Sequence, residues 1–346
     1  MNYKVSVIIP CYNSEKTLER SIKSVINQSI GFENIELILY DDASTDSTTE
    51  IIKKYSNEYK NIIPIFSKKN SGFPGKGRNT GINKSTSEYI MFMDNDDEYE
   101  SHICENLYNE IIESKADLVS SSYINIDEVN TNKIQTPCHY GREINNKIIF
   151  SSEETIYFMN RMIWTCIFKK RIVQENGIHF PEDNLAEDVY FIIYYLLYAN
   201  KVVYLKEYYG LYRHVQNYSL SHSLNLYKLN RLFDIYEEIL EVCDNKNFDC
   251  NYILGDKIAI TLMQLYTSNA INEKTGDVYN LFTRIKNLER KINYKSTLDP
   301  ILNIVNNLIC NNHFKLAIIY FNILQKAYSS KSLILLYRMT IQKLTH

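Results

Sequence analysis

Residues 5–40 read VSVIIPCYNSEKTLERSIKSVINQSIGFENIELILY. The apolar stretches at residues 5–9 and 35–40 each predict a buried β-strand. Between them, residues 17–28 place four apolar side chains on one face of a helix, namely Leu18, Ile22, Val25 and Ile26. A strand, a helix and a second strand in this order are typical of a βαβ unit, in which the two strands lie parallel.

The alternation of strand and helix patterns continues to residue 121. Further strands are expected at residues 62–66, 89–93 and 117–121. Further helices are expected at residues 47–59, 78–85 and 101–114. Pro64 favours a sheet edge for its strand, and Ser47 with Glu50 forms a capping-box pattern at the start of the first of these helices. We therefore predict an α/β fold with a Rossmann-like, mainly parallel sheet flanked by helices.

Beyond residue 122 the pattern is less regular. Residues 125–147 are expected to form a hairpin or loops, and a strand is expected at residues 165–169. Residues 152–162 and 188–198 have helical patterns. From residue 223 to the end the pattern is helical with few turn residues, so we predict a first domain over 1–222 and a helical C-terminal domain over 223–346.

Composition and charge narrow the class of protein. The chain has 346 residues, of which 45% are hydrophobic, and a net charge of -3, which does not suggest a nucleic-acid binder. Seven scattered cysteines without a CxxC pair are typical of reduced thiols in a cytoplasmic protein. The first residues lack a signal-peptide pattern, and the longest apolar run, residues 189–199, is too short to span a bilayer. Any membrane role is therefore expected to be peripheral.

Polar residues follow the predicted strands, where ligands bind in an open parallel sheet. The sharpest group is Asp-Asn-Asp-Asp at residues 94–97, directly after a strand. Three carboxylates this close repel one another unless a cation is present, and oxygen ligands suit Mg²⁺ or Mn²⁺. Such an ion neutralises a departing diphosphate. The alternative is a solvated acidic turn.

Three further residues each fit two roles when taken singly. Asp42 suits either a hydrogen bond from a nucleobase or the cap of the next helix. Tyr12 suits either stacking on a base or packing in the core. Arg78 suits either a contact with a diphosphate or ribose, or a solvated helix surface.

Four motifs decide among these alternatives by resemblance. They read VSVIIPCYNSEKTLERSIKSVINQS, ELILYDDASTDST, NSGFPGKGRNTGI and EYIMFMDNDDEY. In order and spacing they resemble the donor half of glycosyltransferase family 2, whose fold is GT-A. The resemblance implies a donor half at residues 1–100 and an acceptor half at residues 101–222. It also implies that Pro10, Tyr12 and Asp42 hold the nucleobase, usually uracil, and that Arg78 contacts the donor.

The same resemblance assigns the acidic motif and the cofactor. It implies that Asp96 ligates Mn²⁺ or Mg²⁺, while Asp94 and Asn95 lie on the donor side. YRHVQNYSLS at residues 212–221 resembles the element that closes over the diphosphate. It implies that His214 is a further metal ligand and that Arg213 contacts the donor.

A glycosyl transfer also needs a base, because the acceptor hydroxyl is a poor nucleophile until its proton is removed. AEDVYF at residues 186–191 resembles the family's E-D motif, which implies that Asp188 is the base. Glu187 and Trp164 are then assigned to the sugar and acceptor pocket. The alternatives are an acidic pair favoured by the helix dipole and a core tryptophan.

The region after residue 222 lies outside this resemblance. Its last part is basic, with only Asp299 opposing Lys291, Lys295, Lys315, Lys326, Lys331, Arg338 and Lys343. A basic amphipathic face suits peripheral contact with anionic lipid, an anionic polymer or a second copy of the chain. The alternative is a helical domain with a solvated basic face.

The function expected from this resemblance is inverting transfer of a sugar from a nucleotide diphosphate, usually UDP, to an acceptor hydroxyl. The acceptor is expected to be a polysaccharide, a teichoic acid or a lipid-linked molecule at the inner face of the cytoplasmic membrane, since wall teichoic acid glycosyltransferases are similar in length and E-D region. Two alternatives stay open, a nucleotidyltransferase on a related fold and a catalytically silent nucleotide-sugar-binding or scaffold protein. The first of these usually has a glycine-rich loop where this chain has residues 10–13, PCYN.

Overall fold

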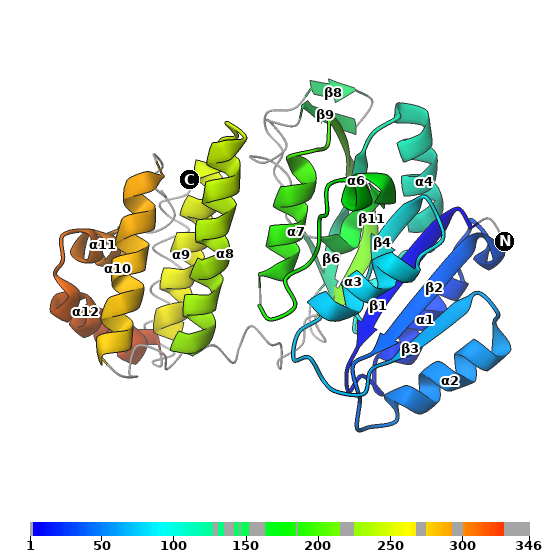
Figure 1. Cartoon of the computed structure of the whole chain (residues 1–346), viewed down its shortest axis with the longest axis horizontal. Coiled ribbons are helices and arrows are strands. Elements are labelled where there is room, and N and C mark those ends of the chain that lie inside the picture. The colour runs from blue at the N-terminus through cyan, green and yellow to red at the C-terminus, as the bar shows by residue number, and fades with distance from the viewer. Residues whose placement is uncertain are drawn as a thin grey trace. The chain divides into compact units, whose positions relative to one another are not determined.

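The structure is a computed structural model of the whole chain. It describes residues 3–126, 131–134, 142–144, 147–151, 163–184, 186–214, 225–267, 275–292 and 300–328. The chain divides into two compact units, Met1–Asn217 and Tyr218–His346 (Figure 1). The predicted boundary at residues 222 and 223 lies outside the described residues, as does the predicted helix at residues 152–162.

The first unit is built on one large mixed sheet with the strand order β3-β2-β1-β4-β10-β6-β11-β9-β8. The first four strands in this order are parallel, which confirms the predicted α/β class. They are β3 (Ile62–Phe66), β2 (Ile35–Asp41), β1 (Val5–Cys11) and β4 (Tyr89–Phe92). The strand that contains Pro64 lies at the sheet edge, as predicted.

Antiparallel strands extend this parallel half. The strand β10 (Cys166–Lys169) runs antiparallel between β4 and β6 (Leu118–Ile126), and β11 (Lys201–His214) runs parallel to β6. Short strands add antiparallel pairs. They are β5 (Glu98–Tyr99) and β9 (Lys147–Ser151), which pair with β11, β7 (Thr131–Ile134), which pairs with β6, and β8 (Arg142–Ile144), which pairs with β9.

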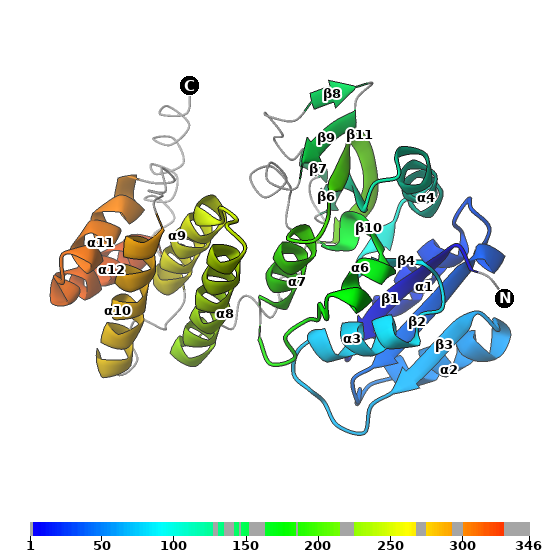
Figure 2. The ribbon, with the colours of Figure 1, turned by 45° about the horizontal axis from the view of Figure 1, so that its top comes forward.

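Helices cover both faces of the sheet (Figures 1 and 2). They are α1 (Leu18–Ile26), α2 (Thr48–Glu58), α3 (Gly75–Lys84), α4 (Ile103–Ser114), α6 (Lys170–Glu175) and α7 (Glu187–Leu196). Two glycines let α3 lie directly on the strands: a Cβ on Gly81 would stand 2.4 Å from the Ile8 side chain, and one on Gly77 would stand 2.8 Å from Tyr40. This close packing fixes α3 against the carboxyl ends of β1 and β2.

The start of α2 differs from the prediction. The Ser47 side chain makes no capping hydrogen bond. The Thr48 N–H donates to Asp46 Oδ1 at 2.9 Å, and the Ser47 N–H donates to Glu15 Oε2 at 3.1 Å. The helix begins where expected, but a carboxylate from the loop after β1 takes the place that the capping box assigned to Glu50.

An aromatic cluster forms the core between the sheet and α7. Phe180 stacks on Phe191 with ring centroids 4.0 Å apart, and Phe92 packs edge-on against both rings. Phe168 adds an edge contact to Phe191, and Tyr195 packs on Phe168. Aromatic pairs of this geometry add to the free energy of burial. The cluster therefore holds α7 in a fixed position against β4 and β10.

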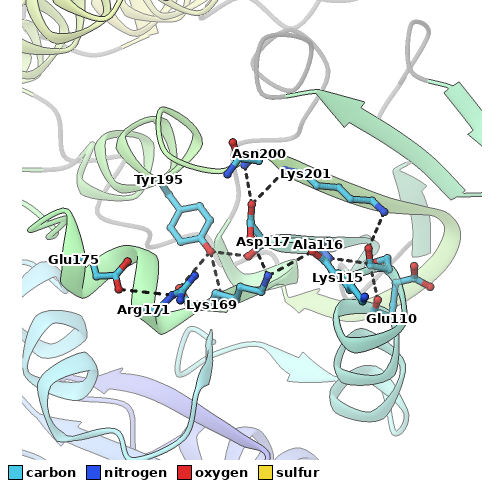
Figure 3. Close-up of polar contacts among 11 residues, drawn as sticks. Glu110, Lys115, Ala116, Asp117, Lys169, Arg171, Glu175, Tyr195, Asn200 and Lys201 are labelled. Carbon is cyan, nitrogen blue, oxygen red and sulfur yellow. Dashed lines mark hydrogen bonds and ion pairs between the residues drawn. The ribbon is translucent and has the colours of Figure 1, made fainter.

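A partly buried polar network ties the amino ends of β6 and β11 to the end of β10 (Figure 3). The Asp117 carboxylate accepts hydrogen bonds from the N–H groups of Asn200 and Lys201 and from Lys169 Nζ. The Tyr195 hydroxyl donates to the Asp117 carbonyl at 2.6 Å. Parallel strands put their carboxyl ends at the other edge, so this network stabilises the fold away from the predicted site.

We expect Asp117→Asn to destabilise the fold by about 1–3 kcal/mol, because an amide is a poorer acceptor for these three donors. Burial raises the pKa of Asp117, but the hydrogen bonds from Asn200 and Lys169 outweigh burial and hold it below its usual range. The stabilisation is therefore present above the unfolded pKa and is lost as pH falls through the folded value. Urea unfolding at pH 7 and pH 3 measures this. A difference between wild type and variant that grows at pH 3 would contradict the assignment.

The second unit is helical, as predicted. Its described helices are α8 (Leu226–Asn245), α9 (Asn251–Thr267), α10 (Thr275–Lys291), α11 (Pro300–Cys310) and α12 (Phe314–Tyr328). Arg284 of α10 pairs with Asp234 and Glu237 of α8, which fastens these two helices together. Among the described residues, no helix combines the length and apolar character needed to cross a membrane.

Candidate active site

The loop after β2 presents one buried carboxylate that is only half satisfied. Asp42 is 7% exposed, and its Oδ2 accepts hydrogen bonds from the N–H and the hydroxyl of Ser71 at 2.8 and 2.7 Å. Its Oδ1 is buried and has no hydrogen-bond partner among the residues that the structure describes. The neighbouring Asp41 differs, since both of its oxygens accept hydrogen bonds, from Ser44 and Thr49. Asp42 thus keeps an acceptor available for a ligand, and its carboxylate does not cap the next helix.

The loop after β1 lies beside that carboxylate. Tyr12 is 47% exposed, so it is not a core residue and its ring is available for stacking. Asn13 Oδ1 accepts from the Thr45 N–H at 2.8 Å, which ties this loop to the one after β2. The Pro10 carbonyl accepts from Asn95 Nδ2 at 2.9 Å, which ties it to the loop after β4. The structure therefore brings Pro10, Tyr12, Asp42 and Asn95 together at the carboxyl ends of β1, β2 and β4.

The loop after β4 gathers three carboxylates. One oxygen from each of Asp94, Asp96 and Asp97 lies within 4.8 Å of the other two. Burial, and then the charge of Asp94, raises the pKa of Asp96 to about 6. Burial also raises the pKa of Asp97 well above its usual value, with Asp94 and Asp96 adding to this. Crowded carboxylates with raised pKa values fit a hard divalent cation, which would relieve their repulsion. Sequence reasoning singled out Asp96 in this motif and did not assign Asp97.

A buried arginine links this acidic loop to the start of α7. Arg78 is 3% exposed; its Nη2 lies 2.7 Å from Asp94 Oδ1, and its Nη1 lies 2.7 Å from Glu187 Oε1. Its Cζ lies 5.4 Å from the centre of the Phe180 ring. Arg78 is therefore not a solvated helix residue. Of its nitrogens, Nε alone lacks a protein partner within the described chain, so its predicted contact with a donor stays a prediction.

The acidic pair at the start of α7 lies around the same guanidinium. Burial raises the pKa of Glu187 to about 8, the charge of Asp188 adds to this, and Arg78 opposes it. Burial lowers the pKa of Arg78, but Asp94, Glu187 and Asp188 together raise it above its usual value. The half-buried Asp188 is thus close enough to Arg78 and Glu187 to act on both. One arginine brings the acidic loop and the predicted base together.

Local packing explains why α7 starts here. The segment before α7 lies against α3, where a Cβ on Gly75 would stand 2.2 Å from the Pro181 carbonyl oxygen. Asn79 and Phe180 exchange two hydrogen bonds of 2.8 Å between side chain and backbone. These contacts join segments about a hundred positions apart in the sequence and bring Glu187 to Arg78.

The end of β11 contacts the acidic loop from another side. The His214 N–H donates to Asp97 Oδ1 at 3.1 Å, and His214 Nε2 lies 3.5 Å from Glu98 Oε2. Arg213 lies over the Trp164 ring at 5.6 Å from its centre, and Trp164 is 7% exposed against Tyr123. Burial, and then the charge of Arg20, lower the pKa of His214, while Glu98 opposes them. The predicted metal ligation by His214 stays a prediction. Trp164 lies in the core, so its role in an acceptor pocket also stays a prediction.

A cavity of about 650 Å³ lies between α1, β5 and the end of β11. Lys16, Arg20 and Glu98 are among its lining residues, and none of the predicted site residues lines it. It therefore neighbours the acidic loop without being part of the site described above.

Residues 6–173 match the sequence family described as glycosyl transferase family 2. A poly(ribitol-phosphate) beta-N-acetylglucosaminyltransferase, TarP of Staphylococcus aureus, is 31% identical over 272 residues, which cover 75% of this chain and 80% of TarP. The chain belongs to glycosyltransferase family 2. A cholesterol galactosyltransferase of Borreliella burgdorferi is 32% identical over 216 residues, or 60% of this family 2 chain and 59% of that protein.

Other relatives of this family 2 member are longer. The chain spans 39% of glycosyltransferase GlyA of Streptococcus pneumoniae and 30% of a poly(ribitol-phosphate) beta-glucosyltransferase of Bacillus spizizenii. Among solved structures, residues 1–349 of S. aureus TarS with UDP-GlcNAc superpose with a TM-score of 0.70 at 19% identity, covering 95% of this chain and 92% of that one. This likeness confirms the GT-A fold.

Proposed function

We propose that this protein transfers a sugar, with inversion, from a nucleotide-diphosphate donor to an acceptor hydroxyl. The observation that carries the proposal is the Arg78 bridge, which joins Asp94 of the acidic loop to Glu187, next to Asp188. A donor diphosphate at the acidic loop would then lie beside a carboxylate that can take the acceptor proton. Membership of the family supports the same reaction class.

The donor is proposed to be a UDP-sugar. A uracil ring offers one N–H donor, which matches the single unpartnered oxygen of Asp42, and Tyr12 offers an exposed ring for stacking. Support also comes from the TarS structure that contains UDP-GlcNAc. The PCYN segment after β1 lacks the glycine-rich loop of nucleotidyltransferases, so the transferase reading is favoured over that alternative.

The proposed cofactor is Mn²⁺ or Mg²⁺, held by Asp96 with Asp94 and Asp97 around it. The three clustered carboxylates supply the oxygen ligands that such ions prefer. A mannosyltransferase from Pyrobaculum calidifontis that shares the fold, with a TM-score of 0.52 at 12% identity, was solved with GDP-Man and Mn²⁺. When bound, the ion would neutralise the charge of the departing diphosphate.

Asp188 is the proposed base. It would accept the proton of the acceptor hydroxyl while that oxygen bonds to the anomeric carbon and the bond from that carbon to the diphosphate oxygen breaks. The nucleotide diphosphate leaves from the opposite side, so the anomeric configuration inverts. Glu187, held by Arg78, would keep the start of α7 and thus Asp188 at the reacting centre.

The proposed acceptor is a hydroxyl of a cell-surface polymer or glycolipid precursor. The names of the relatives support this, because TarP acts on poly(ribitol-phosphate) and the Borreliella enzyme on cholesterol. We propose action on the cytoplasmic side of the membrane. Contact of the C-terminal helices with lipid or with a second copy of the chain also stays a prediction.

Asp42→Ala is expected to weaken UDP binding about tenfold or more, because a hydrogen bond to a carboxylate contributes roughly 1.5–3 kcal/mol. Isothermal titration with UDP and Mn²⁺ measures the change. Asp41→Asn is the matched control, since both Asp41 oxygens already bind protein groups. That control should unfold at a lower temperature yet bind UDP like the wild type. Equal UDP affinity in Asp42→Ala and wild type would show that Asp42 does not bind the uracil ring.

The test of the function itself is a thermal-shift screen of nucleotide-sugars with and without Mn²⁺, followed by assay of the released nucleotide. A donor that binds only the folded protein raises its unfolding temperature by mass action. We expect a UDP-sugar to do so when Mn²⁺ is present and to yield UDP. Release of pyrophosphate would favour the nucleotidyltransferase, and binding without any turnover on a panel of acceptors would favour the silent protein.

A further inference from the structure

Two side chains of α1 hold the backbone of the acidic loop from behind. Arg20 Nη2 donates a hydrogen bond to the Asp96 carbonyl oxygen. The Ser21 hydroxyl lies 2.6 Å from the Asp97 carbonyl oxygen and 3.0 Å from that of Asn95. Three successive carbonyl groups of the loop therefore point at one turn of α1. Ser21 is fully buried, so water cannot replace its hydrogen bonds.

The loop that α1 holds also carries the three clustered carboxylates. The carbonyl oxygens of residues 95–97 accept hydrogen bonds from α1, and one carboxylate oxygen from each of Asp94, Asp96 and Asp97 lies within 4.8 Å of the other two. Such a cluster opposes its own formation, because like charges repel. The cost of gathering the carboxylates must then be offset by contacts elsewhere, and the hydrogen bonds to the loop backbone are such contacts.

The charge of Arg20 suits this role. Within the described chain, Arg20 forms no ion pair with a carboxylate, and the hydrogen bond of its guanidinium goes to the backbone of the acidic loop. Lys23, on the same helix, differs because its Nζ lies 3.8 Å from Glu19 Oε2 and its side chain is 60% exposed. Arg20 and Lys23 are therefore two like charges on one helix, of which one reaches the loop.

We propose that Arg20 and Ser21 are positioning residues, which preorganise the acidic loop for a divalent cation by holding its backbone carbonyl groups. They act through the loop and contact neither the ion nor the donor. This inference rests on the proposal that the acidic cluster binds a divalent cation. It adds that α1, whose sequence carries no metal-ligand pattern, sets the affinity of that site.

The electrostatic and positioning roles of Arg20 predict opposite changes. Removing a positive charge near a cation site should by itself strengthen cation binding. Removing a hydrogen bond that orders the ligands should weaken it. Arg20→Met removes both the charge and the donor, so the direction of the change shows which role dominates. Ser21→Ala removes only the hydroxyl and changes no charge.

The experiment titrates the full-length protein with Mn²⁺ in the presence of UDP and follows free Mn²⁺ by its electron paramagnetic resonance signal, well below the unfolding temperature of each variant. We expect roughly fivefold to tenfold weaker binding for Arg20→Met and about threefold to fivefold for Ser21→Ala, as for the loss of one or two hydrogen bonds. Lys23→Met is the matched control and should bind like the wild type. Asp96→Ala should lose binding.

Each other result has a defined meaning. Unchanged or tighter Mn²⁺ binding in Arg20→Met overturns the positioning role of Arg20, and unchanged binding in Ser21→Ala overturns that of Ser21. Equal weakening in Lys23→Met would show that the loss does not depend on the side chain that reaches the loop, and it overturns the inference. Absence of Mn²⁺ binding by the wild type overturns the metal proposal and this inference with it, whereas normal wild-type binding with unchanged variants overturns the inference alone.

Discussion

Asp188→Asn is expected to lower kcat by about 10²–10⁴-fold, the usual contribution of a general base. The amide keeps the size of the carboxylate and can still accept the short hydrogen bond that the Val189 N–H donates to Asp188 Oδ1. It cannot take a proton from an acceptor hydroxyl. The start of α7 should therefore keep its structure while the transfer step fails. The rate of UDP release from the donor in the presence of an acceptor measures the loss.

Binding measurements show whether the variant lost only its catalytic base or also its ability to bind the donor. Because Asp188 is proposed to act on the acceptor, the affinity of Asp188→Asn for UDP and Mn²⁺ should stay near that of the wild type. The parallel variant Asp183→Asn changes an exposed carboxylate of the segment before α7 and should retain activity. Near-normal turnover in Asp188→Asn would falsify the base assignment. Loss of UDP affinity in the same variant would place Asp188 on the donor side instead.

The sequence predicted that the loops after β1, β2 and β4 lie together, because its signals there are local. A buried strand followed at once by polar residues defines where each loop lies, and the parallel order of β1, β2 and β4 brings those loops together. Asp42 and the acidic motif could thus be assigned to one edge from spacing alone. Among the described residues Asp42 keeps one buried oxygen without a hydrogen-bond partner, and Tyr12 is exposed, but the donor-binding roles of both stay predictions.

Contacts between distant segments could not be predicted in the same way. One partner of Arg78, Glu187, lies 109 positions away, and Trp164 packs on Tyr123 of β6. No periodicity records such pairs, because they depend on the packing of α3 and α7. The capping box at Ser47 failed for the same reason, since Glu15 reaches its N–H from the loop after β1.

Arg78→Met is expected to lower the free energy of unfolding by about 1–3 kcal/mol, because the buried Glu187 and the part-exposed Asp94 both lose a hydrogen-bond donor. Methionine fills the space over Phe180 but donates no hydrogen bond to Asp94 or Glu187. The second variant Arg78→Met/Glu187→Gln replaces one of the two acidic side chains that lose their donor and should recover part of the loss. Urea unfolding measures both. A single variant as stable as the wild type would show that the bridge does not hold the two segments together.

The pH dependence of the same variants tests the bridge further. Because burial raises the pKa of Glu187 to about 8, the folded protein binds more protons than the unfolded chain between about pH 4.5 and 8, and stability falls as pH rises through that range. Glu187→Gln should remove this decline. In Arg78→Met the decline should extend to higher pH, because the charge that opposed the upward shift of the Glu187 pKa is gone. If Arg78→Met and wild type instead follow parallel curves, Arg78 does not control the ionisation of Glu187, and the acidic loop and the start of α7 must be held together by the packing of α3 alone.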